Sequence, residues 1–375
     1  MQVLRAIAAF AVVYFHSQRA AMNRSGFEVP FTSIGAAGVD VFFVLSGFIM
    51  IYISRQRDVN PLEFGFNRFA RIFPTYWLIT LIFALSPVLF PGVVNNPWDW
   101  DLVLQSALLI PVDHPYQENS YSLLVFVGWT LRFELLFYAI FALSLFSRTQ
   151  RFALCALGVF LCAWAFEIMS GMGPYAKELA GPDLMMIEFI YGMALAQIHF
   201  SHGAQIMEWV RKIPALAYLA LLIVLLAAIF YLFALGDLRL FKLQAGLSRA
   251  FRWGIPAVLL TATFVWMVPR LLTWLGPVRT VLVAAGDASY SVYLLHILVI
   301  RWVANTEIQT LYSGWMGFYG FIATVFVLVG LLSWLLYLAF ERPSIKLMKW
   351  TWARYVERNK AAGPSSTAPA TQSAE

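Results

Sequence analysis

The sequence predicts an all-helical membrane protein that crosses the bilayer about ten times. Of the 375 residues, 61% are hydrophobic and only 12% are charged, and the mean hydropathy is +0.73. A soluble domain carries about 25% charged residues, so this chain has too little charge to cover a water-facing surface. Apolar stretches of roughly 20 residues, the length that crosses a hydrocarbon core, recur along it. The predicted spans are 2–18, 36–54, 72–90, 123–146, 152–169, 184–200, 215–234, 252–269, 281–302 and 317–339.

The remaining segments suggest one membrane domain followed by a short tail. Residues 102–111 are apolar but too short to span, so we expect them to lie at the interface or to re-enter. The membrane domain is expected to occupy residues 1–345. A cytoplasmic tail, 346–375, follows it, and its Ala-, Pro-, Ser- and Thr-rich end is expected to be disordered from about residue 361. No internal repeat is visible, which weakens the case for an inverted-repeat transporter.

The distribution of Lys and Arg predicts that both termini are cytoplasmic. With the N-terminus inside, the cytoplasmic segments carry 17 of these residues and the outer segments carry 8. Basic residues favour the cytoplasmic side of a membrane protein, so the net charge of +6 needs no nucleic-acid partner. The basic loop at 239–252 is the one poor fit. The outer segment 91–122 agrees, because it has no Lys or Arg but contains Asp99, Asp101, Asp113 and Glu118.

The first span contains two candidate catalytic residues. Arg5 and His16 are eleven residues apart, which is about three helical turns, so they share one face about 16 Å apart. Arg5 would lie at the cytoplasmic end and His16 in the outer half. Histidine is the natural general base near neutral pH. The alternatives are an arginine that snorkels to the cytoplasmic interface and an interfacial histidine.

The second and third spans add a buried acid and an arginine pair. Asp40 is expected to orient a catalytic or sugar-binding group, or else to anchor its helix at the outer interface. Arg68 and Arg71 are three residues apart, so they share a face just before a span on the cytoplasmic side. Guanidinium forks match phosphate oxygens, and the pair suits a phosphate-bearing donor such as coenzyme A. Simple positive-inside anchoring is the alternative.

The fourth span places Arg132 and Glu134 about halfway through the membrane. A carboxylate there is costly and therefore a functional candidate. Glu134 is expected to pair with Arg132 or Arg5, or to hold a histidine in one tautomer; a purely structural ion pair is the alternative. Trp129 and Tyr138 flank it and are candidate substrate-binding residues, with ordinary packing as the alternative.

Later residues complete the candidate set. His296 in the ninth span is comparable in depth with His16, and it is interpreted as a substrate-binding histidine or a satisfied core histidine. Asp287 opens the same stretch and is read as a helix cap or surface residue. Glu341, before Arg342 and a proline, is expected to form an interfacial ion pair. Cys155 and Cys162 are read as buried small residues, so neither a metal site nor a disulfide is expected.

Six stretches in these spans carry a family resemblance, in the family's own order, from residue 3 to 343. They are LRAIAAFAVVYFH, GVDVFFVLSGF, NRFARIFPTYW, GWTLRFELLFY, SYSVYLLH and ERP. Together they resemble the acyltransferase 3 family of bacterial membrane O-acyltransferases. The GWTL-x-x-E version and the LRAIAA start are most similar to the exopolysaccharide O-acetyltransferases of the succinoglycan type.

The resemblance implies ten spans in the bacterial cytoplasmic (inner) membrane and an acyl-coenzyme A donor, usually acetyl-coenzyme A, with no permanently bound cofactor. It implies an acceptor sugar in an exopolysaccharide, lipopolysaccharide or similar glycan, free or lipid-linked. Membrane lipids and polysaccharide assembly proteins are candidate partners. The family's Arg-x10-His pair falls on Arg5 and His16, and its Arg-x-x-Arg on Arg68 and Arg71.

Two departures from the family pattern affect these expectations. The leader before Leu4 is shorter than usual, which leaves open whether the true start lies upstream. No stretch resembling the family's optional periplasmic hydrolase-like domain is seen in this sequence, so we expect that a second transfer step needs another protein or does not occur.

The sequence supports a mechanism but leaves three function classes open. In the first, His16 removes a proton from a sugar hydroxyl, and the oxygen attacks the thioester; an acyl-histidine intermediate is the variant. Glu134, Asp40 or Arg5 would orient His16 or stabilise charge. The second class is a transporter or flippase of a lipid-linked sugar. The third is a non-catalytic scaffold in a polysaccharide assembly complex. Loops 91–122 and 235–250 are expected to shape the sugar pocket.

Overall fold

The structure is a computed structural model that describes residues 1–27, 29, 33–89, 91, 99–113, 121–180, 184–237, 249–305 and 314–361. Within these residues the chain is helical apart from one small ladder, which confirms the predicted fold class. The ladder pairs β1 (Val112–Asp113) antiparallel with β2 (Tyr121–Ser122). The predicted disorder at the end of the tail, and Glu118, concern positions outside the described residues.

The described helices follow the predicted order, with four short 3-10 or π turns between or at the ends of helices. Their bounds are α1 Gln2–Ser25, η1 Ile34–Ala37, α2 Gly38–Gln56, α3 Pro61–Leu89, α4 Trp100–Ala107, η2 Phe126–Gly128, α5 Trp129–Ser144, α6 Arg151–Ser170, α7 Pro174–Ala180, α8 Ile187–Lys212, α9 Ala215–Asp237, η3 Ala250–Gly254, α10 Ile255–Trp266, α11 Val268–Trp274, α12 Pro277–Asp287, α13 Ser289–Asn305, α14 Gly314–Leu336, η5 Tyr337–Glu341 and α15 Arg342–Ala361.

Six helical runs in the described residues are long and apolar enough to cross a membrane, and two bent helix pairs raise the number to eight. The chain is therefore a multi-pass membrane protein. Helices α1 and α8 were also predicted to span, but they are not in this set because polar residues such as Arg5, His16 and Glu188 interrupt their apolar runs. The count of ten spans stays a prediction.

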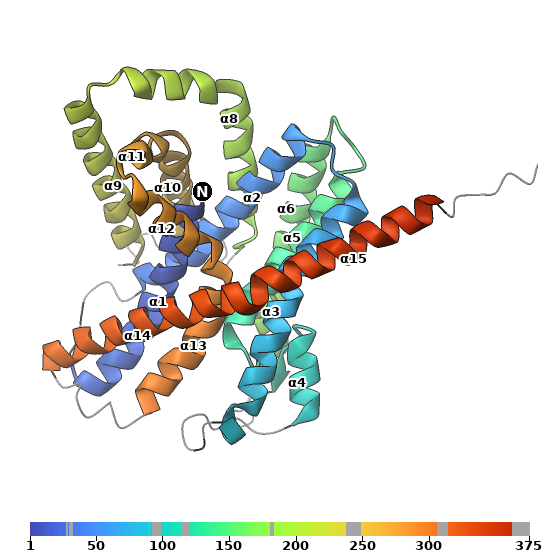
Figure 1. Ribbon diagram of the computed structural model, residues 1–375, viewed down its shortest axis with the longest axis vertical. Coiled ribbons are helices and arrows are strands. Elements are labelled where there is room, and N and C mark those ends of the chain that lie inside the picture. Colours follow the sequence, from blue (N-terminus) through green and yellow to red (C-terminus); the bar gives the residue numbers. More distant parts are fainter. Residues whose placement is uncertain are drawn as a thin grey trace, which may run out of the picture.

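Helix α1 lies at the centre of the fold, which buries its functional residues. It contacts α12, α13 and α14. Figure 1 shows α14, η5 and α15 as one long helix that crosses the front of the molecule over α1, and this run extends for 45 residues, Trp315–Asn359. Helices α8 to α12 gather at one end of the view, and α3, α4 and α13 at the other.

Helices α2 and α8 pack in close contact because glycines face each other across their crossing. A Cβ atom on Gly192 would lie 1.8 Å from the carbonyl oxygen of Val44, and one on Gly47 would lie 2.1 Å from that of Phe189. Small residues let membrane helices approach in this way. The stacked rings of Phe43 and Phe189, 4.5 Å apart, complete the crossing. This contact fixes the position of α2 and of the polar residues that it carries.

Two predicted spans differ from the observed helices. Span four was expected at 123–146, but α5 begins at Trp129 after a 3-10 turn, because residues 121–122 are paired in β2. Arg132 and Glu134 lie in the first two turns of α5, and Glu134 is near the middle of the apolar run Phe126–Ser144, which is long enough to cross a membrane, as predicted. The short segment 102–111 forms α4, and the hydroxyl of Tyr76 on α3 donates to the carbonyl oxygen of Ser106 at 2.6 Å.

Span nine, predicted as one helix over 281–302, is broken between α12 and α13 by a bend of 67°. The start of α1 packs into this break. A Cβ atom on Gly286 would lie 2.0 Å from the carbonyl oxygen of Gln2, and the Gln2 side-chain amide donates to the carboxylate of Asp287. Asp287 thus joins two helices instead of facing solvent alone.

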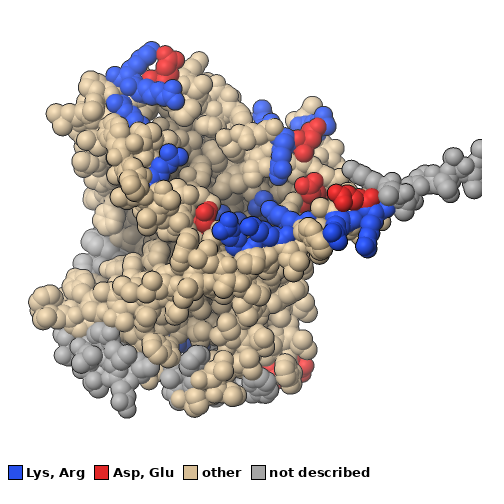
Figure 2. Space-filling model, in the orientation of Figure 1, with Lys and Arg blue, Asp and Glu red and all other residues tan. Residues whose placement is uncertain are grey.

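Charged side chains are unevenly distributed over the surface. Figure 2 shows Lys and Arg gathered along α15 and above it, whereas the lower half of the same face is mostly uncharged. This is the pattern expected when one side faces the cytoplasm. The cytoplasmic location of both termini stays a prediction.

Candidate active site

Three adjoining cavities run through the region around α1. The mouth, about 180 Å³, is lined by polar residues of α2, α3 and α15. The central chamber and the distal chamber each measure about 330 Å³. The mouth and the central chamber share Ile53, Arg68 and Arg71, and the two chambers share Val39 and Tyr293. The three spaces therefore follow one another in a row.

Each cavity has a distinct set of polar residues, by which it is defined. The mouth has Arg57, Asp58, Glu63, Asn67, Arg68, Arg71 and Lys349. The central chamber has Arg5, Ser46, Arg68, Arg71, Thr130, Glu134, Tyr138, Ser289, Tyr290 and Tyr293. The distal chamber has His16, Arg19, Trp129, Glu178, Arg249 and Tyr293, together with the rings of Phe15 and Phe126.

In the central chamber, Glu134 is the hub of a small network. The hydroxyl of Tyr138, one turn further along α5, donates to its carboxylate, and Ser46 Oγ on α2 donates to the same oxygen at 3.5 Å. The guanidinium of Arg68 lies over the Tyr138 ring, 5.3 Å from its centroid. Three helices thus contribute to one polar cluster beside the mouth.

Arg5 enters the same chamber from α1. Its Nε donates to Ser289 Oγ at 3.2 Å, at the break between α12 and α13. Together with Arg68 and Arg71 it places three guanidinium groups on a space whose lining contains one carboxylate, that of Glu134. Buried charges are stable when opposite charges meet them. This excess of positive charge in the lining therefore suits an anionic ligand.

Arg132 does not pair with Glu134, although the sequence allowed this. Its Nη2 donates to the carbonyl oxygen of Glu178 at 2.9 Å and lies 3.6 Å from the Glu178 carboxylate. The side chain therefore points toward α7 and away from the central chamber. Burial raises the pKa of Glu178, which lies in the short helix α7, and the nearby Arg132 acts in the opposite direction.

Two histidines meet at the distal chamber. The rings of His16 and His296 lie 5.2 Å apart between centroids. His296 is completely buried, and its Nδ1 lies 2.6 Å from the carbonyl oxygen of Tyr293. Its Nε2 has no hydrogen-bond partner among the described residues. His16 lines the chamber, whereas His296 packs against His16 and is not part of the lining. A substrate-binding role for His296 therefore stays a prediction.

Asp40 holds an arginine at the distal chamber. It accepts two hydrogen bonds from Arg249, from Nε at 3.0 Å and from Nη2 at 2.8 Å. Asp40 is completely buried, which excludes an anchor exposed at the interface. Arg249 also lies 4.7 Å from the ring centroid of Trp253 and lines the chamber that contains His16. Asp40 thus orients Arg249, and any influence on His16 passes through that residue.

Sequence reasoning did not identify Glu188 or Arg249 as residues of the site. Glu188 on α8 is completely buried, and the rule that flagged Glu134 would have flagged it, because it lies in predicted span 184–200. Arg249 was assigned to the basic outer loop; of the other basic residues of that loop, Arg239 and Lys242 lie outside the described residues and Arg252 lies in η3. Glu341, for which an interfacial ion pair was predicted, is buried and accepts a hydrogen bond from Ser291 Oγ at 2.5 Å.

The predicted site residues therefore divide between the two chambers. The central chamber contains Arg5, Glu134 and Tyr138 together with the Arg68–Arg71 pair. The distal chamber contains His16 and Trp129.

Comparison with known proteins gives a consistent result over most of the chain. A family model described as "Acyltransferase domain" matches residues 1–338. The exopolysaccharide production protein ExoZ of Rhizobium meliloti (strain 1021) is 34% identical over 325 residues, which cover 84% of this chain and 90% of that protein. Acyltransferase MdmB of Streptomyces mycarofaciens is 29% identical over 298 residues, covering 72% and 70%. Nodulation protein 10 of Rhizobium leguminosarum bv. viciae is 26% identical over 340 residues, covering 83% of each chain. No solved structure gives a significant match.

Proposed function

The chain belongs to the acyltransferase 3 family, and on that premise we propose that it transfers an acyl group, normally acetyl, from acyl-coenzyme A to a hydroxyl of an exported polysaccharide. The observation that carries the proposal is the row of three cavities, with an arginine pair where the first two meet and His16 in the third. A relative named for exopolysaccharide production supports the choice of acceptor class.

The donor side is assigned to the mouth and the central chamber. Arg68 and Arg71 line both, so phosphates bound there would leave the acyl arm directed into the central chamber. Guanidinium groups bind phosphate oxygens with paired hydrogen bonds. Apolar side chains such as Phe42, Phe43 and Leu45 line the rest of that chamber and suit the narrow, largely apolar arm of coenzyme A.

The acceptor side is assigned to the distal chamber. Trp129, Phe15 and Phe126 offer aromatic faces, and the lining also contains the charged groups of Arg19, Glu178 and Arg249. Ligand pockets commonly combine apolar faces with a few polar groups that fix orientation. A sugar fits this pattern, because its ring presents C–H faces and its edge presents hydroxyl groups.

The proposed reaction takes place where the two chambers meet. His16 removes a proton from the acceptor hydroxyl, and the oxygen attacks the thioester carbonyl. An ester C–O bond forms, the C–S bond breaks, and the sulfur of coenzyme A takes up the proton from His16. Arg249, fixed by Asp40, would stabilise the negative charge on the carbonyl oxygen. Arg5 and Glu134 would hold the donor. Transfer through an acyl-histidine is the alternative route.

We also propose that the mouth faces the cytoplasm of a bacterial cell and that the distal chamber faces outward across the inner membrane. Acyl-coenzyme A is made in the cytoplasm, and the basic band in Figure 2 lies on the side of the mouth, where Arg57 and Lys349 are found. The positive-inside rule supports the same orientation.

The decisive experiment incubates the purified protein with acetyl-coenzyme A, labelled in the acetyl group, and with polysaccharide from a strain that lacks this protein. The proposal expects labelled polysaccharide and an equal amount of free coenzyme A. A transporter would move the label without releasing coenzyme A, and a scaffold would do neither. Label transfer that does not require the protein would also contradict the proposal.

A further inference from the structure

We infer that helix α15 completes the donor site, and that Lys349 together with Arg57 binds the 3′-phosphate on the adenosine end of coenzyme A. The inference rests on the proposed acyl-coenzyme A donor and concerns the part of the donor farthest from the acyl group. Helix α15 begins at Arg342, and the family match ends at residue 338. The assigned residue Lys349 therefore lies beyond the matched domain.

Helix α15 is held in place by its own continuity and by α3. It continues from α14 through the π turn η5 without a break, as Figure 1 shows. Further along, Trp352 stacks on Phe66 of α3, with ring centroids 4.6 Å apart and planes 18° apart. Ile345 and Lys349 are four residues apart and so share one face. Both line the mouth, so this face of α15 forms one of its walls.

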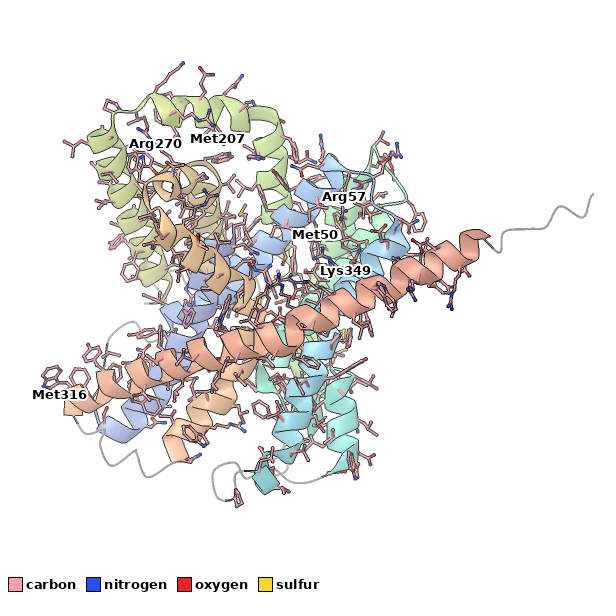
Figure 3. All side chains as sticks on the ribbon, in the orientation of Figure 1. Met50, Arg57, Met207, Arg270, Met316 and Lys349 are labelled. Atoms are coloured by element: carbon pink, nitrogen blue, oxygen red, sulfur yellow. The ribbon has the colours of Figure 1, made fainter. Side chains whose placement is uncertain are left out.

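The mouth carries more positive than negative charge. Its lining contains the cations Arg57, Arg68, Arg71 and Lys349 and the carboxylates Asp58 and Glu63. The Asp58 carboxylate is engaged by Arg148 at 2.7 Å. Figure 3 labels Lys349 on α15 and Arg57 above it, and both residues line the mouth. An anionic ligand is therefore favoured there.

The order of the cations matches the order of the phosphates in coenzyme A. Arg68 and Arg71 line both the mouth and the central chamber, whereas Arg57 and Lys349 line the mouth alone. In coenzyme A the arm joins the diphosphate, and the ribose with its 3′-phosphate lies beyond it. With the arm in the central chamber, the diphosphate meets the first pair and the 3′-phosphate meets the second. A phosphomonoester carries about −1.5 to −2 charges at pH 7, so it is the group that most needs these cations.

The test measures equilibrium binding of coenzyme A and of 3′-dephospho-coenzyme A to the purified full-length protein in lipid nanodiscs, which requires no acceptor. The wild-type protein should bind coenzyme A more tightly than the dephospho form. Lys349→Gln and Arg57→Gln should each weaken coenzyme A binding by roughly threefold to tenfold. Neither should change the Kd of the dephospho form, because that ligand lacks the group that they bind.

Lys346→Gln is the matched control, because Lys346 lies on the same exposed helix but does not line the mouth. It should leave both Kd values unchanged. If Lys349→Gln weakens the binding of both ligands equally, so that the ratio of the two Kd values is unchanged, the inference is overturned. The proposed donor would then still stand. Failure of the wild-type protein to bind either ligand would instead contradict the proposal that acyl-coenzyme A is the donor.

Discussion

The central and distal chambers have the same volume, about 330 Å³, but opposite chemical character. The central chamber has three guanidinium groups around a hydrogen-bonded carboxylate. The distal chamber has an imidazole, aromatic faces and Arg249 held by Asp40. Both chambers receive a residue from one face of α1, Arg5 in the first and His16 in the second. The difference teaches that one helix can supply a charge that holds the donor and a base that activates the acceptor, about three turns apart.

The largest expected effect is that of removing the imidazole of the distal chamber, because the proposed chemical step depends on it. His16→Ala should lower acylation of the polysaccharide by roughly 10²- to 10⁴-fold, the usual contribution of a general base. Acetyl incorporation into polysaccharide, normalised to protein in the membrane, measures this. His202→Ala is the control, because His202 is exposed and lies in neither chamber. Wild-type acylation by the His16 variant would remove His16 from the mechanism.

A second substitution addresses the donor side. Arg71→Gln should raise the Kd for acetyl-coenzyme A by roughly 10- to 100-fold, because hydrogen bonds between charged groups contribute about 1.5–3 kcal/mol. Titration calorimetry on the purified protein measures the change. Arg211→Gln, at an exposed position on α8, should bind the donor as the wild type does. An unchanged Kd in the Arg71 variant would mean that the pair serves as a membrane anchor alone.

The third prediction concerns the buried pair of the distal chamber. Asp40→Asn and Arg249→Gln should each destabilise the protein by about 3–5 kcal/mol, because each leaves one member of a buried ion pair uncompensated. The double variant should recover much of that stability while acylation stays roughly tenfold low, since the chamber has lost its arginine. Thermal unfolding and acylation are both measured. Full activity in the double variant would reduce the pair to a structural role.

The smallest expected effect tests the Glu134 network. Tyr138→Phe removes the hydroxyl that donates to Glu134 but keeps the ring beneath Arg68. Because Glu134 keeps its second hydrogen bond, from Ser46, only part of the energy of this bond should be lost, and donor affinity should fall by roughly twofold to tenfold. The KM for acetyl-coenzyme A is the relevant measurement, and kcat should change little. A large fall in kcat with an unchanged KM would place Tyr138 at the chemical step.

Spacing along single helices was enough to predict much of this arrangement. Arg5 and His16 could be placed on one face of one helix, and Arg68 and Arg71 together near an interface, because 3.6-residue periodicity is a local property. The rule that buried charges are costly also identified Asp40 and Glu134 as functional candidates. The structure adds that all of these residues except Asp40 line adjoining cavities, and that Asp40 holds Arg249 at one of them.

Partnerships between helices could not be predicted from the sequence. Which of Arg132 and Arg249 meets a given carboxylate depends on how each helix is rotated and on where it begins. Arg132, in the first turn of α5, points toward Glu178. Arg249 reached Asp40 although 209 positions separate them in the chain. The glycine contacts between α2 and α8 set the rotation of α2, and no local pattern records that geometry.

The most direct test of the division between the chambers measures donor binding and acyl transfer on the same His16→Ala preparation. The account predicts a Kd for acetyl-coenzyme A equal to that of the wild type and no detectable transfer to polysaccharide. Loss of donor binding, or transfer at the wild-type rate, would contradict it.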